Sequence, residues 1–333
     1  MKSTTGEINK FLKANLKAIS WEMTPIKKGG SDRGFFRICL PDNSSFIFMH
    51  YGTDIEENYY WAGINEFLAG LEISVPRIIA QDLRQHFILM EDLGDIDLWS
   101  QSALSWDKRR IYYYQVLTQI RQLHTFEFTK IPSNLKLSES YGPRLYKWEH
   151  DYFLENLVSA VCQLKLSPSL LKDLHKELDG LVIRIQNMEP CLIHRDLQSQ
   201  NIMIKNDQPV LIDFQGMRLG NFFYDLGSLI CDPYVTFATE ERNELINFYY
   251  DLMKPDYSRN DFAIYFWEAS AQRLMQALGA YGFLGLKKNK PDFLKHAYNG
   301  IRNLFLATSN TGNLPILHGL SQQCESILAD RQI

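Results

Sequence analysis

The segment that most constrains this chain is CLIHRDLQSQNIMIKNDQPVLIDFQG, residues 191–216. Two short apolar runs, residues 201–204 and 210–214, flank the pair Asn206-Asp207, which favours a tight hairpin turn. Asn201 begins the first run and Asp213 lies near the end of the second, so an antiparallel ladder brings both side chains to one end of the hairpin. The fold must therefore leave that end of the hairpin accessible.

The polar residues of this segment match the requirements of one reaction. An amide oxygen from Asn201 beside a carboxylate from Asp213 suits Mg²⁺, which phosphate oxygens complete. Asp196, in the loop before the first strand, can accept a proton from a hydroxyl nucleophile. Taken singly, Asp196 could cap a turn, Asp213 could end a strand, Asn201 could hold a local turn, and His194 could brace the loop. The joint spacing favours a site for phosphoryl transfer.

The first part of the chain has the pattern of a small sheet with helices. Capping-box spacing at Thr4 and Glu7, followed by apolar residues at helical intervals, predicts an opening helix. Residues 21–91 then hold short β-branched and aromatic runs separated by turn signals, which predict about five antiparallel strands. Between the third and fourth runs, residues 54–70 have the pattern of one helix.

The remainder of the chain is mainly helical. Helices are predicted from Ser105 to His124, from Trp148 to Leu164, and from Ser167 onward with one buried face, and again after Glu240. The expected fold class is α+β, with a small antiparallel-sheet lobe over residues 1–94, a hinge at 91–94, and a larger helical lobe over 95–333.

Composition argues against two classes of partner. Thirty-five Lys and Arg against 39 Asp and Glu give a formal charge of −4, so a basic face for nucleic acid is not expected.

The five cysteines never form a C-x-x-C pair and are predicted to be reduced core thiols. The N-terminus lacks an apolar signal region, and no stretch has the length of a membrane span. We expect a cytoplasmic protein with a small-molecule substrate and no membrane or nucleic-acid partner, and the pattern leaves protein partners open.

The motifs HRDLQSQN and IDFQG resemble the catalytic and metal-binding motifs of the protein-kinase-like superfamily, in the branch of aminoglycoside phosphotransferases and choline kinases. YDLGSL follows so soon after Asp213 that no long activation loop fits between them. The resemblance implies a bilobal protein-kinase-like fold with ATP and Mg²⁺ as cofactors. It implies Asp196 as the catalytic base, Asn201 and Asp213 as metal ligands, and Asp225 as an anchor for the catalytic loop.

The resemblance extends to the predicted sheet lobe. GGSDRGFFRI is similar to the phosphate-covering hairpin of the bacterial branch, although a Gly-Gly turn alone is common in ordinary hairpins. The stretch VPRIIAQDLRQHFILMEDLGD is similar to the strands and hinge that hold adenine, with Ile47 and Phe48 as possible ring contacts. The residues that the resemblance assigns to nucleotide binding are Gly29, Gly30, Ser31, Arg33, Gly34, Glu91 and Leu93.

One departure from the family pattern concerns the third strand. The family places a phosphate-binding Lys there, whereas SFIFMH has Met49 or His50 at that place. We expect the missing charge to come from the metal ion, from Arg33 or Arg37, or from a protonated His50. Glu66, the helix residue that would pair with the Lys, is expected to be solvated.

A helix near the C-terminus supplies the predicted substrate residues. QRLMQALGAYGFLG is similar to a helix of the bacterial anomeric kinases for N-acetylmuramate and N-acetylglucosamine, the nearest group. Glu268, Gln272 and Gln276 recur every four residues, and Trp267 and Arg273 accompany them. This stripe could bind sugar hydroxyls or could face solvent. We assign Trp267, Glu268, Gln272 and Arg273 to the substrate site.

The combined expectation is an ATP- and Mg²⁺-dependent phosphotransferase acting on a hydroxyl of a small polar metabolite, in particular an amino sugar. An aminoglycoside or choline-type kinase is the alternative enzyme. A nucleotide-binding pseudokinase scaffold is the alternative from another class, and the missing Lys motivates it. The intact trio of Asp196, Asn201 and Asp213 argues against the scaffold, which has no need of all three.

Overall fold

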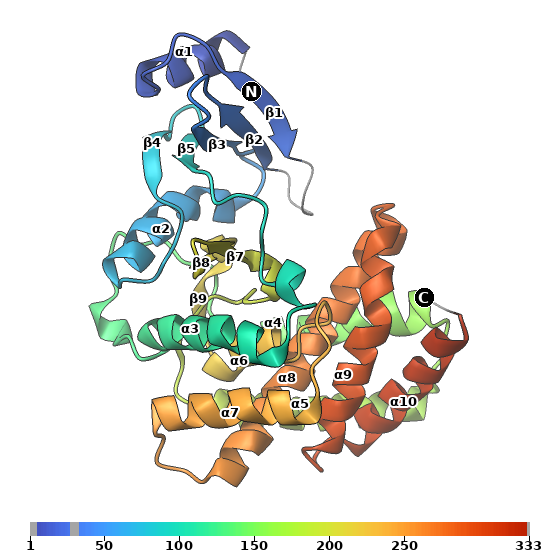
Figure 1. Cartoon of the computed structure of the whole chain (residues 1–333). Helices are drawn as coiled ribbons and strands as arrows, with labels where there is room; N and C mark the ends of the chain where they lie inside the picture. The colour runs from blue at the N-terminus through green and yellow to red at the C-terminus, as the bar shows by residue number, and fades with distance from the viewer. Residues whose placement is uncertain (1–4, 27–32, 332–333) are drawn as a thin grey trace.

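A five-stranded antiparallel sheet forms the upper lobe in Figure 1, in a computed structural model that describes residues 5–26 and 33–331. The strand order is β1-β2-β3-β5-β4, so every neighbouring pair is consecutive in the chain except β3 and β5 inside the sheet. The five strands predicted from the short apolar runs are confirmed. They are β1 (Glu22–Ile26), β2 (Gly34–Cys39), β3 (Ser45–His50), β4 (Ile78–Asp82) and β5 (Phe87–Glu91).

Alternation along the strands gives the sheet two apolar faces. Phe48 and its neighbours on β2 and β5 pack under α1 (Thr5–Asn15), which covers the outer face. Ile47 and Met49 face the other way, toward α2 (Trp61–Gly70). Phe48 therefore lies on the face away from the second lobe, and its predicted contact with adenine is wrong. The helix predicted over 54–70 is divided, because a 3₁₀ turn, η1 (Glu56–Tyr60), precedes α2.

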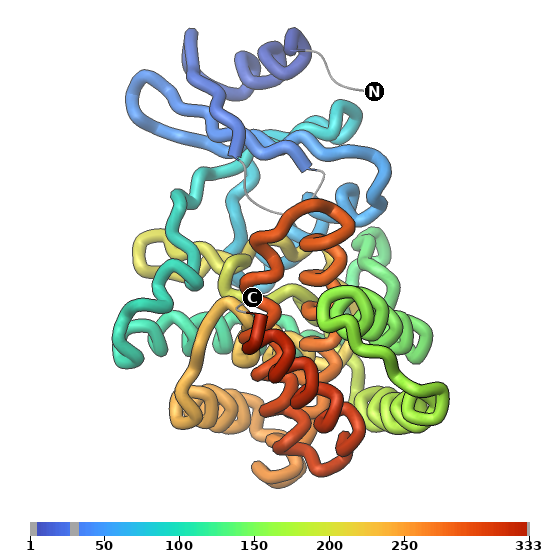
Figure 2. The backbone as a smooth tube through the Cα atoms, turned by 90° about the vertical axis from the view of Figure 1, so that its right-hand side faces the viewer, coloured from blue at the N-terminus to red at the C-terminus, as the bar shows by residue number. Residues whose placement is uncertain are grey.

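The lower lobe is helical and is organised around α8 (Arg259–Gly282), which is buried along most of its length. Figure 2 shows the sheet lobe above this helical lobe, with α9 and α10 on the side facing the viewer. Around α8 pack α4, α6 and α9. The helices of this lobe are α3 (Trp106–His124), α4 (Pro143–Phe153), the π-helix η4 (Leu154–Val161), α5 (Pro168–Gln186), α6 (Phe222–Ile230), α7 (Thr239–Met253), α9 (Ala297–Ser309) and α10 (Pro315–Asp330), with short turns η3 (Phe128–Lys130), η7 (Phe283–Lys287) and η8 (Pro291–His296).

The predicted hairpin is present as β7 (Ile202–Lys205) and β8 (Gln208–Leu211). Its two turn residues, Asn206 and Asp207, both have positive φ angles, 50° and 58°, as a two-residue hairpin turn of this type requires. The first strand is shifted by one residue from its predicted place, because Asn201 closes the 3₁₀ turn η5 (Ser199–Asn201), and the second strand ends at Leu211, before Asp213. A second short pair, β6 (Cys191–Ile193) with β9 (Arg218–Gly220), was not predicted.

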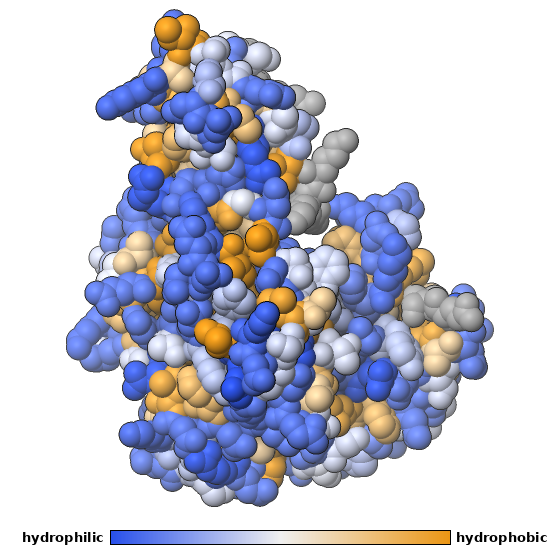
Figure 3. Space-filling model, in the orientation of Figure 1, coloured by the Kyte–Doolittle hydropathy of each residue, from blue (hydrophilic) through white to orange (hydrophobic). Residues whose placement is uncertain are grey.

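The two lobes meet at the end of this hairpin. The ring of Trp61 on α2 lies 5.2 Å from the ring of Phe214, which follows Asp213 in the 3₁₀ turn η6 (Phe214–Gly216). Figure 3 shows a hollow on the surface between the sheet lobe and the tip of the C-terminal helices. The predicted boundary between the two lobes at residue 94 stays a prediction. Among the described residues, none of the helices combines the length and the apolarity that a membrane crossing requires.

Candidate active site

Residues 194–201, here called the Asp196 loop, are held in place by a buried carboxylate. Asp225, in the first turn of α6, accepts hydrogen bonds from the backbone N–H of His194 at 2.7 Å and of Arg195 at 2.8 Å. Its Oδ2 also lies 3.0 Å from Nε2 of His124 on α3. Arg195 has a φ of +80°, a conformation that the two bonds to Asp225 help to hold. The anchoring role that the resemblance implied for Asp225 is confirmed.

Asp196, the predicted base, carries an arginine on each oxygen. Arg195 donates to Oδ2, and Arg273 of α8 donates from Nη2 to Oδ1 at 3.3 Å. Burial alone would raise the pKa of Asp196, but the two guanidinium groups hold that pKa below its ordinary value. The side chain is 20% exposed, so an ionised carboxylate stays in reach of a ligand.

Asn201 and Asp213, the predicted metal ligands, meet at the open end of the hairpin. The Nδ2 of Asn201 donates to the carbonyl oxygen of Asp196 at 2.9 Å, which leaves its amide oxygen available as a ligand. The backbone N–H of Ile212 donates to the carbonyl oxygen of Asn201 at 2.9 Å, and Asp213 is the residue that directly follows this bond. Asp213 has a left-handed φ of 63°, which turns it out of the strand. Two oxygen ligands of this kind fit a hard divalent cation.

A cation from the other lobe already pairs with Asp213. Arg33, just before β2, donates from Nη2 to Oδ1 of Asp213 and from Nη1 to Oε1 of Gln215 at 2.8 Å. Its side chain is only 7% exposed, so the guanidinium lies well inside the interlobe contact. Gly34, beside it, starts β2 opposite His50. Gly29, Gly30 and Ser31 lie outside the described residues.

The third strand supplies no cation in place of the missing Lys. Met49 is fully buried against α2, and the ring of His50 packs edge-on against Phe87 at 5.2 Å. Burial, together with repulsion from His86, lowers the pKa of His50 and so disfavours its protonated form. The structure therefore gives no support to a protonated His50, and that expectation stays a prediction. Glu66 is exposed, as expected for a solvated helix residue.

Arg37, the other candidate for the missing charge, points to the hinge instead. Its Nε donates to Asp92 Oδ2 at 2.7 Å, and its Nη2 donates to Asp95 Oδ1 at 2.9 Å. These two hydrogen bonds raise the pKa of Arg37 and fix its side chain on β2. Arg37 is thus committed to two hinge carboxylates, and the expectation that it lies near the phosphates is wrong.

The predicted hinge is fixed to the hairpin of the lower lobe. Nζ of Lys205, the last residue of β7, lies 3.3 Å from the carboxylate of Glu91 and donates to the carbonyl oxygen of Asp92 at 2.8 Å. Leu93 is buried, and Gly94 has a φ of +80° at the point where the chain turns downward. The adenine contacts of Glu91 and Leu93 stay predictions.

The predicted substrate stripe on α8 is divided between the core and the site. Glu268 is fully buried and pairs with Arg184 at 2.6 Å. Gln272 is also fully buried and donates to Glu149 Oε2 at 2.9 Å. Trp267 is buried beside Phe266 at a ring distance of 4.9 Å.

These three residues satisfy core contacts, so the stripe is not the wall of an open pocket and their predicted substrate role is wrong. Only Arg273 of the predicted set reaches Asp196, and Gln276 supports it by accepting from its Nη1 at 2.6 Å.

Sequence reasoning missed Asp232, which follows α6. Its Oδ2 accepts from the backbone N–H of Ser199 at 2.7 Å, and its Oδ1 accepts from the backbone N–H of Tyr234 at 2.9 Å. The side chain is fully buried, and burial raises its pKa. An acidic residue seven positions after Asp225 and directly before a proline was the available signal, because such residues often close local turns.

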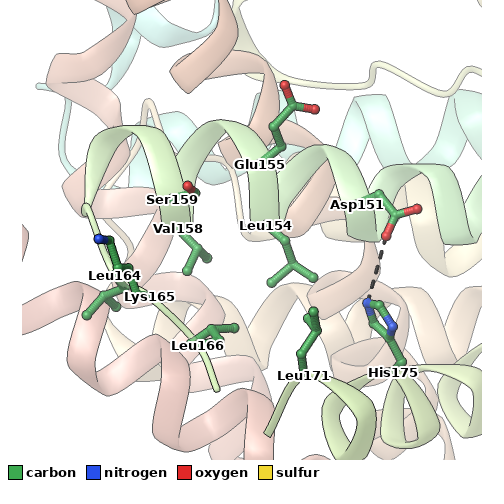
Figure 4. A pocket seen from close by; sticks show the side chains of 10 residues that line it. All are labelled: Asp151, Leu154, Glu155, Val158, Ser159, Leu164, Lys165, Leu166, Leu171 and His175. Atoms are coloured by element: carbon green, nitrogen blue, oxygen red, sulfur yellow. Dashed lines mark ion pairs between the residues drawn. The ribbon is translucent and has the colours of Figure 1, made fainter. Parts of the chain in front are cut away.

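A separate pocket of about 620 Å³ lies on the outer side of the helical lobe between η4 and α5. Figure 4 shows its apolar floor, with Asp151 and His175 forming an ion pair of 3.8 Å at one end. The pocket shares no residue with the Asp196 loop or the hairpin, so we do not assign it to the candidate site. Its full lining is Asp151, Leu154, Glu155, Val158, Ser159, Leu164, Lys165, Leu166, Leu171 and His175.

The fold and the site together define a class of protein. A five-stranded sheet lies over an anchored aspartate and an Asn–Asp pair, and only a few residues separate Asp213 from α6. This is the arrangement of small-molecule kinases. Residues 22–262 match the phosphotransferase enzyme family. The chain belongs to this family.

Curated relatives narrow the group within the family. An N-acetylmuramate/N-acetylglucosamine kinase of Pseudomonas aeruginosa is 24% identical over 288 residues, which cover 82% of this chain and 80% of the relative. A kinase of the same name from Neisseria meningitidis is 22% identical over 267 residues, or 78% of each chain. The bacterial sugar kinases named from the sequence are thus confirmed as relatives.

Solved structures confirm the bilobal α+β fold. An ADP-bound aminoglycoside phosphotransferase superposes with a TM-score of 0.62 at 15% identity, covering 95% of this chain and 99% of that one. A choline/ethanolamine kinase family protein from Mesorhizobium loti also gives 0.62, at 14% identity, covering 95% of this chain and all of that one (100%).

Proposed function

We propose that this small-molecule kinase uses ATP and Mg²⁺ to phosphorylate a hydroxyl of an N-acetylated amino sugar. The observation that carries the proposal is the junction of the Asp196 loop with the hairpin. There Asn201 donates to the backbone of Asp196, and Asp213 follows the residue that donates to the backbone of Asn201. The names of the curated relatives favour the sugar as acceptor.

Each group has a defined part in this proposal. Asp196 orients the acceptor hydroxyl and accepts its proton as the phosphoryl group transfers. Asn201 and Asp213 hold the metal ion, which neutralises charge on the phosphate oxygens when bound. The hinge backbone at Glu91 and Leu93 binds adenine. The two guanidinium groups that hold the pKa of Asp196 below its ordinary value keep this carboxylate ionised, the form that can accept the proton.

Acceptor-dependent consumption of ATP tests the proposal. Purified protein with ATP and Mg²⁺ would be offered N-acetylmuramate, N-acetylglucosamine, choline and kanamycin, and the phosphorylated product would be identified by mass spectrometry. We expect the N-acetylated sugars to have the highest kcat/KM. Faster turnover of choline or kanamycin would refute the sugar assignment, and no consumption with any acceptor would favour the scaffold alternative.

Arg33 is expected to take over part of the role of the missing Lys. Arg33→Ala should raise the KM for ATP about tenfold, since one charge-assisted hydrogen bond contributes about 1.5–3 kcal/mol. The support is the position of Arg33 on Asp213, where γ-phosphate oxygens would approach the metal ion. Arg84→Ala, which removes an exposed arginine of the same lobe, is the matched control. An unchanged or lower KM would show that Arg33 does not assist phosphate binding.

Arg273 is expected to favour acceptors that carry a carboxylate. Its Nε and Nη1 are held by Ser228 and Gln276, so Nη2 is fixed next to Asp196. Arg273→Ala should lower kcat/KM for N-acetylmuramate about tenfold more than for N-acetylglucosamine, because only the former offers an anionic partner. The ratio of the two kcat/KM values isolates this effect from any general loss at Asp196. An unchanged ratio would remove Arg273 from acceptor recognition.

A further inference from the structure

Three aromatic side chains from distant parts of the sequence converge beside the Asp196 loop. They are Trp99 of η2 (Trp99–Gln101), Tyr234 after α6, and His296 at the end of η8, here called the aromatic patch. The ring centroids of Tyr234 and His296 are 4.3 Å apart, and Trp99 lies 5.8 Å from Tyr234 and 6.0 Å from His296. Tyr281 of α8 packs behind them, 6.0 Å from Tyr234.

Two backbone connections place this patch against the loop. Asp232 accepts from the N–H of both Ser199 and Tyr234, so one carboxylate joins Tyr234 to the Asp196 loop. On the other side, the N–H of Leu98 donates to the carbonyl oxygen of Ile202 at 2.8 Å, which brings Trp99 beside the start of β7. The patch therefore flanks the stretch of chain that connects Asp196 to Asn201.

The charges around the patch bear on the kind of ligand it fits. Burial and the nearby charge of Lys295 lower the pKa of His296 and so disfavour its protonated form. Burial and the carboxylate of Asp232 raise the pKa of Tyr234 to about 12, although the hydrogen bond with Tyr281 and the positive charge of Arg273 act in the opposite direction. At the adjacent Asp196 loop two guanidinium groups, those of Arg195 and Arg273, face the single carboxylate of Asp196. This local excess of positive charge disfavours a quaternary ammonium or a polyamine relative to a neutral polar or anionic ligand.

Exposure distinguishes this cluster from ordinary core packing. Tyr234 is 8% exposed, yet Trp99 is 37% exposed while it contacts both other rings. A large exposed aromatic ring next to polar groups is typical of a small-molecule binding site. A pyranose ring presents one apolar C–H face and a polar rim, which matches the aromatic rings of the patch and the charged groups of the adjacent Asp196 loop.

We propose that Trp99, Tyr234 and His296 form the platform on which the C–H face of the acceptor pyranose rests, with its reactive hydroxyl directed to Asp196. This inference rests on the proposed function and adds to it the residues that select a sugar over a cationic acceptor. Because Trp99 is the exposed ring of the patch, its contribution to sugar binding can be measured by substitution.

Kinetics with Trp99 variants tests the platform. Trp99→Ala should raise the KM for N-acetylglucosamine about 3- to 10-fold, the range of one aromatic contact, while the KM for ATP changes less than about twofold. Trp99→Phe should recover most of the affinity. Trp148→Ala is the matched control, since Trp148 is an exposed tryptophan stacked on Tyr152 in α4, which is not part of the patch. An unchanged sugar KM in Trp99→Ala would overturn the platform and leave the proposed function intact.

A binding measurement separates the platform from the kinase activity. Saturation-transfer NMR with N-acetylglucosamine and no nucleotide should show the pyranose C–H protons in closest contact with the protein, and this signal should weaken in Trp99→Ala but not in Trp148→Ala. Equal signals in all three proteins, or no binding to the wild type, would overturn the platform. A patch that retains choline instead, with affinity lost in Trp99→Ala, would also overturn it. If sugar binds through Trp99 but none is phosphorylated, the proposed function fails and the platform stands.

Discussion

Asp196→Asn is expected to lower turnover at saturating substrates by about 10²- to 10⁴-fold, the usual contribution of a general base. The amide keeps the size of the carboxylate but cannot accept the proton of the acceptor hydroxyl. It also removes the negative charge that pairs with Arg195 and Arg273. ATP affinity should change little, because the metal ligands proposed here are Asn201 and Asp213.

The measurement is kcat for the best acceptor, together with the dissociation constant of Mg-ATP by calorimetry. Asp207→Asn is a suitable control, because Asp207 lies in the turn of the same hairpin with a φ of 58°, and asparagine tolerates that conformation. The control should behave like the wild type in both measurements. Near-normal kcat in Asp196→Asn would show that another group accepts the proton.

Features encoded by neighbouring residues were predictable from the sequence. The hairpin followed from Asn206-Asp207, whose residue types permit two consecutive positive φ angles, and from the apolar runs on each side. The sheet followed from the period of its strands, and the same alternation separates Ile47 from Phe48. The anchoring of the Asp196 loop by Asp225 came from family resemblance and could not be derived from spacing alone.

The errors arose where tertiary contacts decide what a side chain does. The spacing of Glu268 and Gln272 fits a pocket, a solvated face or a buried network equally well, and the packing of α8 at the centre of the lobe selected the network. Arg37 was misassigned because Asp92 and Asp95, its partners, are more than fifty residues away in the chain.

Short or nonlocal elements left too little pattern to find. The strands β6 and β9 have three residues each and pair across the whole hairpin segment. The aromatic patch is likewise assembled from three separate elements, so Trp99 carries no local mark of its position near Asp196.

Asp213→Ala is expected to remove most of the Mg²⁺ dependence of nucleotide binding. In the wild type, Mg²⁺ should strengthen ATP binding, because an ion held by the Asp213 carboxylate would neutralise charge on the phosphates. In the variant this strengthening should shrink by about tenfold or more, since the lost contact to a charged group contributes about 1.5–3 kcal/mol. Asn201→Ala should act in the same direction but more weakly, because a neutral amide exerts less field on the ion.

Calorimetry of ATP binding with and without Mg²⁺ measures this dependence directly. The pairing of Arg33 with Asp213 adds an expectation for metal-free binding. Loss of Asp213 also removes one of the partners of the Arg33 guanidinium, so its Nη2 can turn to the phosphates while Gln215 still holds Nη1, and metal-free ATP should bind the variant at least as well as the wild type. A purely structural role for Asp213 would instead weaken ATP binding equally under both conditions. Equal metal dependence in the variant and the wild type would therefore exclude Asp213 as a metal ligand. We expect instead that the variant loses the Mg²⁺-dependent part of ATP binding and keeps the metal-free part, because Asp213 both holds the ion and pairs with Arg33.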